Sequence, residues 1–232
     1  MDFGLAFSYP FQDQDWLKKL GIAGLLMIIP VFGWLVVAGW AIEITRRVIR
    51  HDMPLLLPDW NDFGKYIVDG LYLCLIGIIF YIPSFIFSGI TSGVSIFAQN
   101  QGGGDGNSVI PMIVMVVSIC FGCLQFLYGI FLGLVLPAAY ANFAVKGNLG
   151  AAFAIGEIFG MVKAAIGAYV IVLLGSIVAG FIGLLGMIAC FIGVFFTLAY
   201  CSLIEAHLWG QAYNQAQAAM GVSNPPEPMA NV

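Results

Sequence analysis

The amino-acid sequence predicts an all-α membrane protein, a polytopic bundle of about five apolar helices with amphipathic helices at its cytoplasmic face. Hydrophobic residues make up 61% of the 232 residues and charged residues only 9%. A soluble domain carries about 45–50% and about 25% of these two classes. The uncharged stretches 109–141 and 164–204 are longer than the roughly 20 apolar residues that cross a bilayer. Lipid is therefore the solvent that this composition suits.

The positive charges indicate an orientation. All eight Lys and Arg residues lie beside the apolar runs, and such residues collect on the cytoplasmic side of membrane spans. We therefore expect a multi-pass protein of the inner (cytoplasmic) membrane with a cytoplasmic C-terminus. A single membrane domain is predicted over 17–209, between an interfacial segment 1–16 and a polar tail 210–232 that is expected to be disordered after about residue 222. The acidic opening is not typical of a cleavable signal.

The first apolar region has two interpretations. Residues 1–16 mix aromatic and acidic side chains, which suits the headgroup level, and Asp13 or Asp15 is expected near a helix N-cap. Pro30 interrupts the region 17–49, because proline removes a helix hydrogen bond. The region is either one kinked helix that crosses once, or a partly re-entrant helical hairpin that keeps every positive charge on one side. Both interpretations stay open, and with them the side of the N-terminus.

Further along the chain, apolar spans alternate with short amphipathic stretches. We expect interfacial helices after Asp59 and over 150–162. Spans are expected at 70–97, at 109–141 and, as two spans joined by a tight turn at Gly180, Gly183 and Gly186, at 164–209. The glycine-rich polar stretch between the first two of these spans is predicted to be a connector on the outer side.

A weak internal repeat underlies this organisation. In each copy, a span exit rich in small and aromatic residues precedes a charged or polar turn. The three copies are 39–52, 136–149 and 198–213. Repeats are common in transporters, but they also build other helical bundles, so the repeat does not identify a function.

Four strings of unusual composition carry a resemblance to a known family. They are FSYPFQDQDWLKKL (7–20), IPVFG (29–33), RRVIR (46–50) and LPDWNDFGKYIVDGL (57–71). Together they resemble the prokaryotic membrane protein family called domain of unknown function 4013, over most of the chain. The resemblance implies a multi-span helical fold but no activity, so it assigns no site residue. The repeat also resembles, more loosely, membrane domains attached to some glycerophosphodiesterases, whose catalytic part is not found in this sequence.

No catalytic pattern accompanies these strings. The net charge of −4 without a basic tail argues against nucleic acid as a partner. The five cysteines lie in apolar runs, where cysteine behaves as a small hydrophobe, and no metal or cofactor is predicted. The candidate intramembrane polar residues are Glu43, Glu205 and His207, because ionisable groups at depth are usually functional or paired. For Glu43 we expect a local ion pair with Arg46 and Arg47, one helix turn away.

We therefore expect a non-catalytic membrane protein that is a scaffold, assembly or accessory subunit of a membrane complex. Its expected partners are membrane lipids and either further copies of the chain or other membrane subunits. The candidate interaction surface comprises aromatic residues that suit the interface and glycines that allow close helix packing: Phe11, Trp16, Trp60, Phe63, Gly129 and Gly133. The alternative hypothesis is a small transporter or channel built from the repeated helical units.

Overall fold

The computed structural model describes residues 1–52, 54, 56–101, 109–188 and 192–222, and these residues form helices and their connections without any strand. The all-α prediction is confirmed. The chain divides into two compact units, and each is described by itself. The first comprises Met1–Ile76 and Gly133–Val232, and the second comprises Gly77–Leu132. The elements in chain order are α1 (Phe3–Ser8), η1 (Tyr9–Gln12), α2 (Trp16–Met27), α3 (Phe32–Arg50), α4 (Phe63–Gln101), α5 (Ile110–Lys146), α6 (Leu149–Ala152), α7 (Ile155–Ala164), α8 (Ile166–Leu185), η2 (Gly186–Ile188) and α9 (Ile192–Ala219).

Four of the described helices are long and apolar enough to cross a membrane. The qualifying segments are Phe63–Asn100, Pro111–Lys146, Ile166–Ile188 and Ile192–Ala219. Their lengths of 38, 36, 23 and 28 residues exceed the roughly 20 that a bilayer requires. The first apolar region does not qualify: α2 has only 12 residues, and α3, with 19, carries Glu43 and three arginines.

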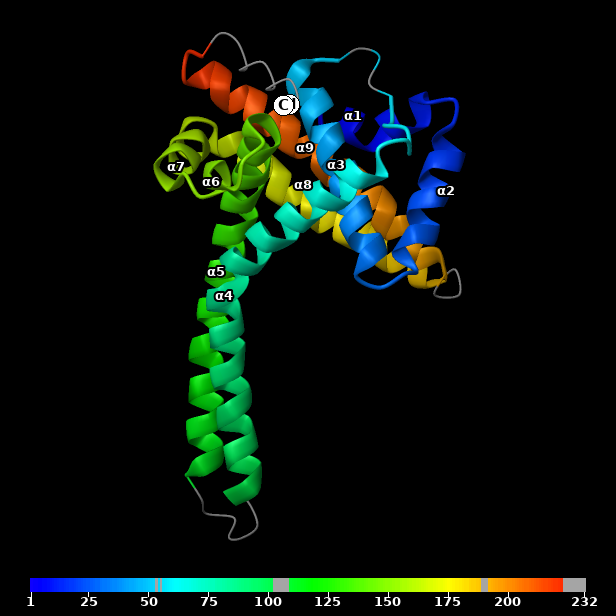
Figure 1. Ribbon diagram of the computed structural model, residues 1–232. Helices are drawn as coiled ribbons and strands as arrows, with labels where there is room; N and C mark the ends of the chain where they lie inside the picture. Colours follow the sequence, from blue (N-terminus) through cyan, green and yellow to red (C-terminus); the bar gives the residue numbers. More distant parts are fainter. Residues whose placement is uncertain (53, 55, 102–108, 189–191, 223–232) are drawn as a thin grey trace. The chain divides into compact units, whose positions relative to one another are not determined.

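The helices α2 and α3 are separate and turn back on each other, as Figure 1 shows. Pro30 and Val31 lie in the break. Val31 has φ 65° and ψ −64°, and the Phe32 amide donates to the Pro30 carbonyl at 2.7 Å. This is the geometry of a classic γ-turn, a rare and strained conformation. A Cβ at Gly33 would overlap the Leu26 carbonyl, so only glycine fits where the two helices meet.

The expected separate helix after Asp59 is instead the beginning of α4, which runs without a break from Phe63 to Gln101. The apolar stripe of this segment faces protein. Trp60, Phe63 and Ile67 pack against the buried core around Trp40. Because these side chains find partners within the first unit, this stretch has no need to lie alone at the interface. The stretch expected at 150–162 divides into α6 and α7.

The region 164–209 forms the predicted pair of antiparallel helices, α8 and α9, with the turn beginning at Gly186. Gly180 and Gly183, which were expected to mark the turn, remain inside α8. The helix α9 ends at Ala219, and the predicted disorder after residue 222 lies outside the described residues.

The core of the first unit is built around α9, which packs on α2, α3 and α8. The largest fully buried side chains include Trp40, Tyr9, Tyr169, Tyr213 and Phe143. Close approach of backbones adds to this packing. A Cβ on Gly39 would overlap the Tyr66 backbone, so α3 and the first turns of α4 meet without an intervening side chain.

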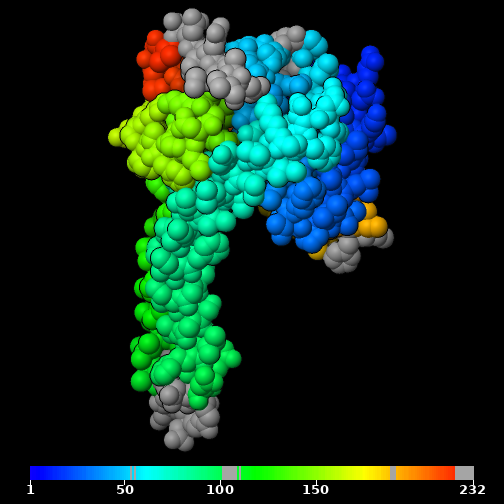
Figure 2. Space-filling view, viewed as in Figure 1, coloured from blue at the N-terminus to red at the C-terminus, as the bar shows by residue number. Residues whose placement is uncertain are grey.

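The second unit consists of the outer halves of α4 and α5, which run side by side (Figures 1 and 2). The Tyr128 hydroxyl donates to the Phe80 carbonyl at 2.7 Å, and the Phe87 ring lies 6.2 Å from Phe121 and 6.1 Å from Tyr128. Most of the remaining apolar side chains are exposed, for example Phe126 with 69% of its surface. A soluble hairpin would bury such side chains, so this surface requires lipid or another apolar partner.

Replacing Gly39 with alanine is expected to lower the free energy of unfolding in detergent by about 1–3 kcal/mol, because the new methyl group must displace the Tyr66 backbone. The matched control is Gly64→Ala, since a Cβ there meets nothing within 4 Å. We expect that control to be neutral or to stabilise by up to about 1 kcal/mol through helix propensity. Thermal unfolding followed by circular dichroism measures both. Equal stability of the two variants would contradict the close contact.

Candidate functional site at the charged end of the first unit

The three repeated segments meet in the first unit. They form the second half of α3, the end of α5 and the middle of α9. The Thr45 hydroxyl donates to the Ala206 carbonyl at 2.9 Å, and Arg46 Nε donates to the Ala144 carbonyl at 3.0 Å. The rings of Tyr140 and Trp209 lie 5.0 Å apart. The span exits that share a sequence plan therefore contact one another.

Glu43 lies at the centre of an ionic cluster at this junction and is only 8% exposed. Its carboxylate accepts hydrogen bonds from Lys65 Nζ at 2.9 Å and from Arg50 Nη2 at 3.1 Å. Arg46 Nη1 lies 3.3 Å from Glu43, and the Arg46 guanidinium also binds both oxygens of Asp69, with Nη2 at 3.0 Å from Oδ1. The cluster joins α3 to the beginning of α4.

The structure extends the predicted local pair. Arg46 and Arg47 contact Glu43 from the same helix, with Arg47 Nε at 4.0 Å. Lys65 and Asp69 come from α4, about 20 residues away, and helix periodicity in α3 gave no signal for them. The sequence feature that could have indicated these partners is the charged string 57–71, which contains Lys65 and Asp69.

A second ionic contact fastens the N-terminal segment. Asp13, 4% exposed, accepts hydrogen bonds from Lys19 Nζ at 2.9 Å and from the amides of Asp15 at 2.8 Å and Leu57 at 3.0 Å. Lys19 also donates to the Leu57 carbonyl at 2.8 Å and pairs with Asp59 at 2.9 Å. We call Asp13, Lys19, Leu57 and Asp59 the N-terminal clamp. Every one of these residues belongs to the strings that carried the family resemblance.

Burial alone would raise the pKa of the Asp13 carboxyl, but the Lys19 ammonium and the two backbone amides outweigh it and hold this pKa below its usual value. Burial alone would lower the pKa of Lys19, but hydrogen bonds and charge from Asp13 and Asp59 raise it. Both groups are therefore charged at neutral pH, and each satisfies the other in a site with little access to water.

Two stacked tryptophans lie beside the N-terminal clamp. The rings of Trp40 and Trp60 are 4.6 Å apart at an interplanar angle of 20°. Trp40 Nε1 donates to the Pro58 carbonyl at 2.9 Å, and Trp60 Nε1 donates to the Lys19 carbonyl at 3.1 Å. The indoles thus use both their faces and their polar edges to connect α3, the 52–62 connection and α2. Trp60 and Phe63, predicted as interaction residues, serve this internal packing.

His207 is buried beneath the N-terminal segment. The Tyr9 ring stacks on its imidazole at 4.6 Å, and the Tyr9 hydroxyl donates to the Leu203 carbonyl at 3.1 Å. The Gln211 amide lies 2.9 Å from His207 Nδ1 and also exchanges two hydrogen bonds with the backbone of Asp2. His207 therefore forms part of the contact between the start of the chain and α9.

The structure does not bring the candidate polar residues together. Glu205 faces α8, where Ser176 is its side-chain partner, whereas His207 faces Tyr9. Two positions apart on a helix, the side chains point to different sides. Within the described ranges, no group of three or more His, Cys, Asp or Glu side chains could hold a metal ion.

The other predicted interaction residues differ in exposure. Phe11 is 51% exposed, and its ring contacts Trp16 at 5.0 Å. A Cβ on Gly129 would meet nothing within 4 Å, so this glycine faces open space. A Cβ on Gly133 would strike the Leu173 side chain of α8, so this glycine permits an internal contact. Phe11 and Gly129 are thus accessible to a partner, and Gly133 is not.

Comparison with known proteins gives a family without an activity. The model of a family described as "Protein of unknown function (DUF4013)" matches residues 22–192. The search of curated proteins and the search of solved structures returned no match. The matched region contains α3, Leu57 and Asp59 of the N-terminal clamp, and the ionic cluster around Glu43.

Replacing Asp13 with asparagine is expected to lower the free energy of unfolding by about 1–3 kcal/mol, because it leaves Lys19 without its buried partner. In the wild type, the contribution of the charged Asp13 to the free energy of unfolding is complete above the unfolded-state pKa of about 4. It is lost as the pH falls through the lower folded-state pKa of Asp13. The difference between variant and wild type should therefore shrink in acid. Denaturant titrations in detergent at several pH values measure it, with the exposed Asp15→Asn as control. A difference that does not depend on pH would count against the ion pair.

Glu43→Gln should also destabilise the protein, by about 1–3 kcal/mol, since the amide keeps the shape of the side chain but removes the charge facing Arg46, Arg50 and Lys65. The control is Asp52→Asn, which breaks an exposed pair with Arg50 at 3.3 Å and should cost less than about 1 kcal/mol. The measurement is the midpoint of thermal unfolding. Equal midpoints for the two variants would show that the cluster contributes no more than a surface pair.

Proposed function

The chain belongs to the family of proteins of unknown function DUF4013, and we propose that it is a non-catalytic integral membrane protein that serves as a scaffold, assembly or accessory subunit of a membrane complex. The observation that carries this proposal is the use made of polar side chains. Asp13, Glu43, Asp69 and His207 all bind partners within the first unit. Groups that would otherwise bind or convert a ligand instead hold the helices together.

The surface that remains for partners is apolar and helical. In the hairpin of the second unit, Phe85, Met112 and Phe126 are 64%, 70% and 69% exposed. Between such side chains, Gly89 and Gly129 face open space, with nothing within 4 Å of an added Cβ. Small residues on a lipid-facing helix let a second helix approach closely. This surface suits lipid and a further copy of the chain or another membrane subunit.

The charge distribution supports the proposed location. The ionic cluster and the N-terminal clamp contain Lys19, Arg46, Arg50 and Lys65, and Lys146 pairs with Glu157 at 2.6 Å at the end of α5. Because positive residues favour the cytoplasmic face, we place this end of the first unit in the cytoplasm, with the protein in the inner membrane of a prokaryote and its C-terminus on the cytoplasmic side.

One observation favours the alternative of a small transporter or channel. Glu205 lies within a helix long enough to span the membrane and has Ser176 of α8 as its partner. A carboxyl at depth is a typical element of an ion pathway. Flux through liposomes that is lost in Glu205→Gln would support this alternative over the scaffold.

Association through the hairpin can be tested with the exposed thiols of Cys120 and Cys123 on α5. In native membranes, oxidation with the membrane-permeant catalyst copper phenanthroline should link the wild-type protein to a second chain by a disulfide, and the double variant C120S/C123S, which keeps the exposed Cys74, should be linked far less. Gly129→Leu should weaken association about tenfold, the effect of about 1.4 kcal/mol of lost packing.

The matched control for this experiment is Gly167→Leu. Gly167 also faces open space, but it lies on α8, outside the hairpin. This control should leave the cross-linked fraction unchanged. A wild-type protein that stays uncross-linked in membranes, and that carries a flux sensitive to Glu205→Gln, would overturn the proposed function.

A further inference from the structure

Two turns of the first unit are apolar where a turn in water would be polar. The turn between α2 and α3 exposes Ile28, Ile29 and Val31 by 45%, 49% and 72%. At the beginning of the turn between α8 and α9, Met187 and Ile188 are 52% and 81% exposed. The sequence has no charged residue between Lys19 and Glu43, or between Lys163 and Glu205. Surface loops usually carry polar residues, so these turns suit a different solvent.

Backbone carbonyls beside both turns accept hydrogen bonds from within the protein. Trp34 Nε1 donates to the Met27 carbonyl at 3.0 Å, where α2 ends, and the Phe32 amide closes the γ-turn onto Pro30. At the other turn, the Thr197 hydroxyl lies 3.1 Å from the Gly183 carbonyl and 3.0 Å from the Val194 carbonyl. In hydrocarbon no water can bind a free carbonyl, and each unsatisfied group costs several kcal/mol. These contacts meet that requirement for the carbonyls of Met27, Pro30, Gly183 and Val194.

The backbone conformation of Val31 is further evidence that the α2–α3 turn lies in lipid. Its φ of 65° is unfavourable for a β-branched residue. Glycine or asparagine would adopt this conformation at lower cost. The turn nevertheless presents an isopropyl group to its surroundings, which is favourable where the surroundings are acyl chains.

Distances along the helices decide how deep the turns lie. At 1.5 Å per residue, the acidic or basic residue nearest to the turn is about 12 Å from it on α2 (Lys19), about 17 Å on α3 (Glu43) and about 20 Å on α9 (Glu205). These three helices pack together, so their depths are linked. A hydrocarbon core is about 30 Å thick. If the turns reached the far face, all three charges would lie inside the core.

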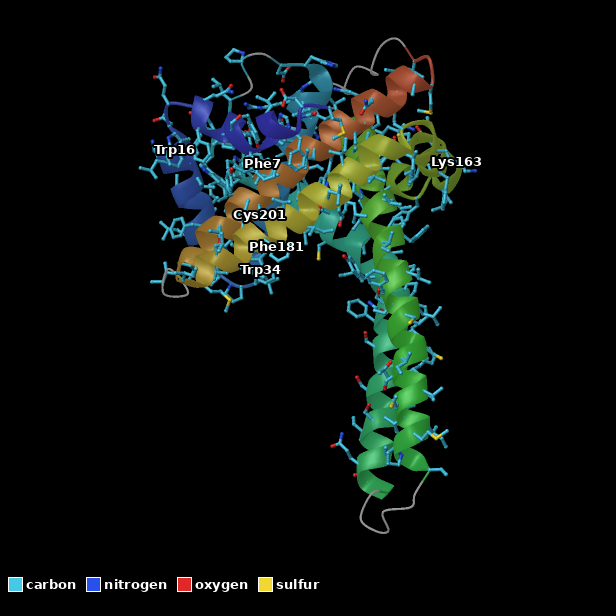
Figure 3. The ribbon with its side chains drawn as sticks, turned by 180° about the vertical axis from the view of Figure 1, so that it is seen from behind. Phe7, Trp16, Trp34, Lys163, Phe181 and Cys201 are labelled. Carbon is cyan, nitrogen blue, oxygen red and sulfur yellow. The ribbon has the colours of Figure 1, made fainter. Side chains whose placement is uncertain are left out.

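We propose that the α2–α3 turn and the α8–α9 turn both end within the hydrocarbon, so that the first unit is inserted from the cytoplasmic face without emerging on the other side. Its charged residues then lie at the near headgroups. In Figure 3, Trp34 and Phe181 lie toward the turns, away from Lys163. The occupant of the exposed turn surfaces is lipid acyl chain. This inference rests on membrane insertion and does not depend on the scaffold role.

The hairpin of α4 and α5 differs from the first unit in its length and in the polarity of its turn. From Asp69 to Asn100, α4 extends about 46 Å, more than the hydrocarbon thickness. The sequence that follows, residues 99–108, is polar and contains Asp105. Among the described helices, α4 and α5 are therefore the two that we assign as crossing the bilayer completely.

The test uses single cysteines in a background in which the native cysteines are replaced by alanine. Val31→Cys and Ile188→Cys report on the two turns, Asn100→Cys on the far end of α4, and Lys18→Cys on the cytoplasmic end of α2. A membrane-impermeant maleimide should label position 100 only in intact cells and position 18 only in inverted vesicles. It should label positions 31 and 188 only after detergent is added. Labelling of position 31 or 188 from either aqueous side would overturn the proposal.

A second measurement needs no cysteine and therefore guards against misfolded variants. Trp34, 56% exposed, is the tryptophan next to the α2–α3 turn. In liposomes of lipids brominated at defined acyl positions, wild-type fluorescence should show quenching by bromines deep in the chain, and Trp34→Phe should lose that part. If the wild-type fluorescence shows no quenching by the deep bromines, then protein covers the turn. That result would also overturn the proposal. The cross-linking result is independent of either outcome.

Discussion

A buried charge is tolerated only when an opposite charge and enough hydrogen bonds accompany it, and the first unit of this protein is organised around that constraint. Asp13 and Lys19 satisfy each other and also the backbone of Leu57. Glu43 is surrounded by cations from two helices. These polar contacts join the same segments as the apolar packing around Trp40, so the ion pairs and the core together hold the N-terminal segment, α3 and the beginning of α4 in place.

The tryptophans also satisfy buried polar groups, because an indole has a large apolar ring and one N–H that donates a hydrogen bond. Trp40 and Trp60 stack on each other while their N–H groups bind carbonyls of Pro58 and Lys19. The Pro58 carbonyl belongs to irregular backbone, which has no helical partner to donate to it, whereas the Lys19 carbonyl lies in the first turns of α2. The Trp40 indole therefore satisfies a backbone carbonyl at the buried part of the connection, Leu57 and Pro58.

Much of the fold follows from periodicity, and the remainder depends on contacts between distant residues. Long uncharged runs and Pro30 correctly indicated the helices and the break in the first region, since these are local effects. The short helix expected after Asp59 was wrong, because its apolar stripe finds partners around Trp40 and the helix continues into the span. The amphipathic pattern is the same whether the apolar face meets lipid or protein, so sequence alone could not separate the two.

The site residues divide in the same way. Glu43 with Arg46 and Arg47 was visible from spacing along one helix. The partners of Asp13 and Arg46, at Leu57 and Asp69, are 44 and 23 residues away, and no helical period connects them. For Glu205 and His207 the spacing of two residues indicated different sides of the helix, and they face α8 and Tyr9 respectively; their partners were not predictable from that spacing.

The contact of Tyr9 and Asp2 with α9 has a consequence for biosynthesis. These hydrogen bonds join residues separated by 194 and 209 positions. At roughly 5–20 residues per second, the N-terminal segment leaves the ribosome about 10–40 s before its binding surface exists. During that interval its aromatic side chains must be kept from other surfaces, by the headgroup layer or by a chaperone. The N-terminal segment can therefore pack on α9 only near the end of translation.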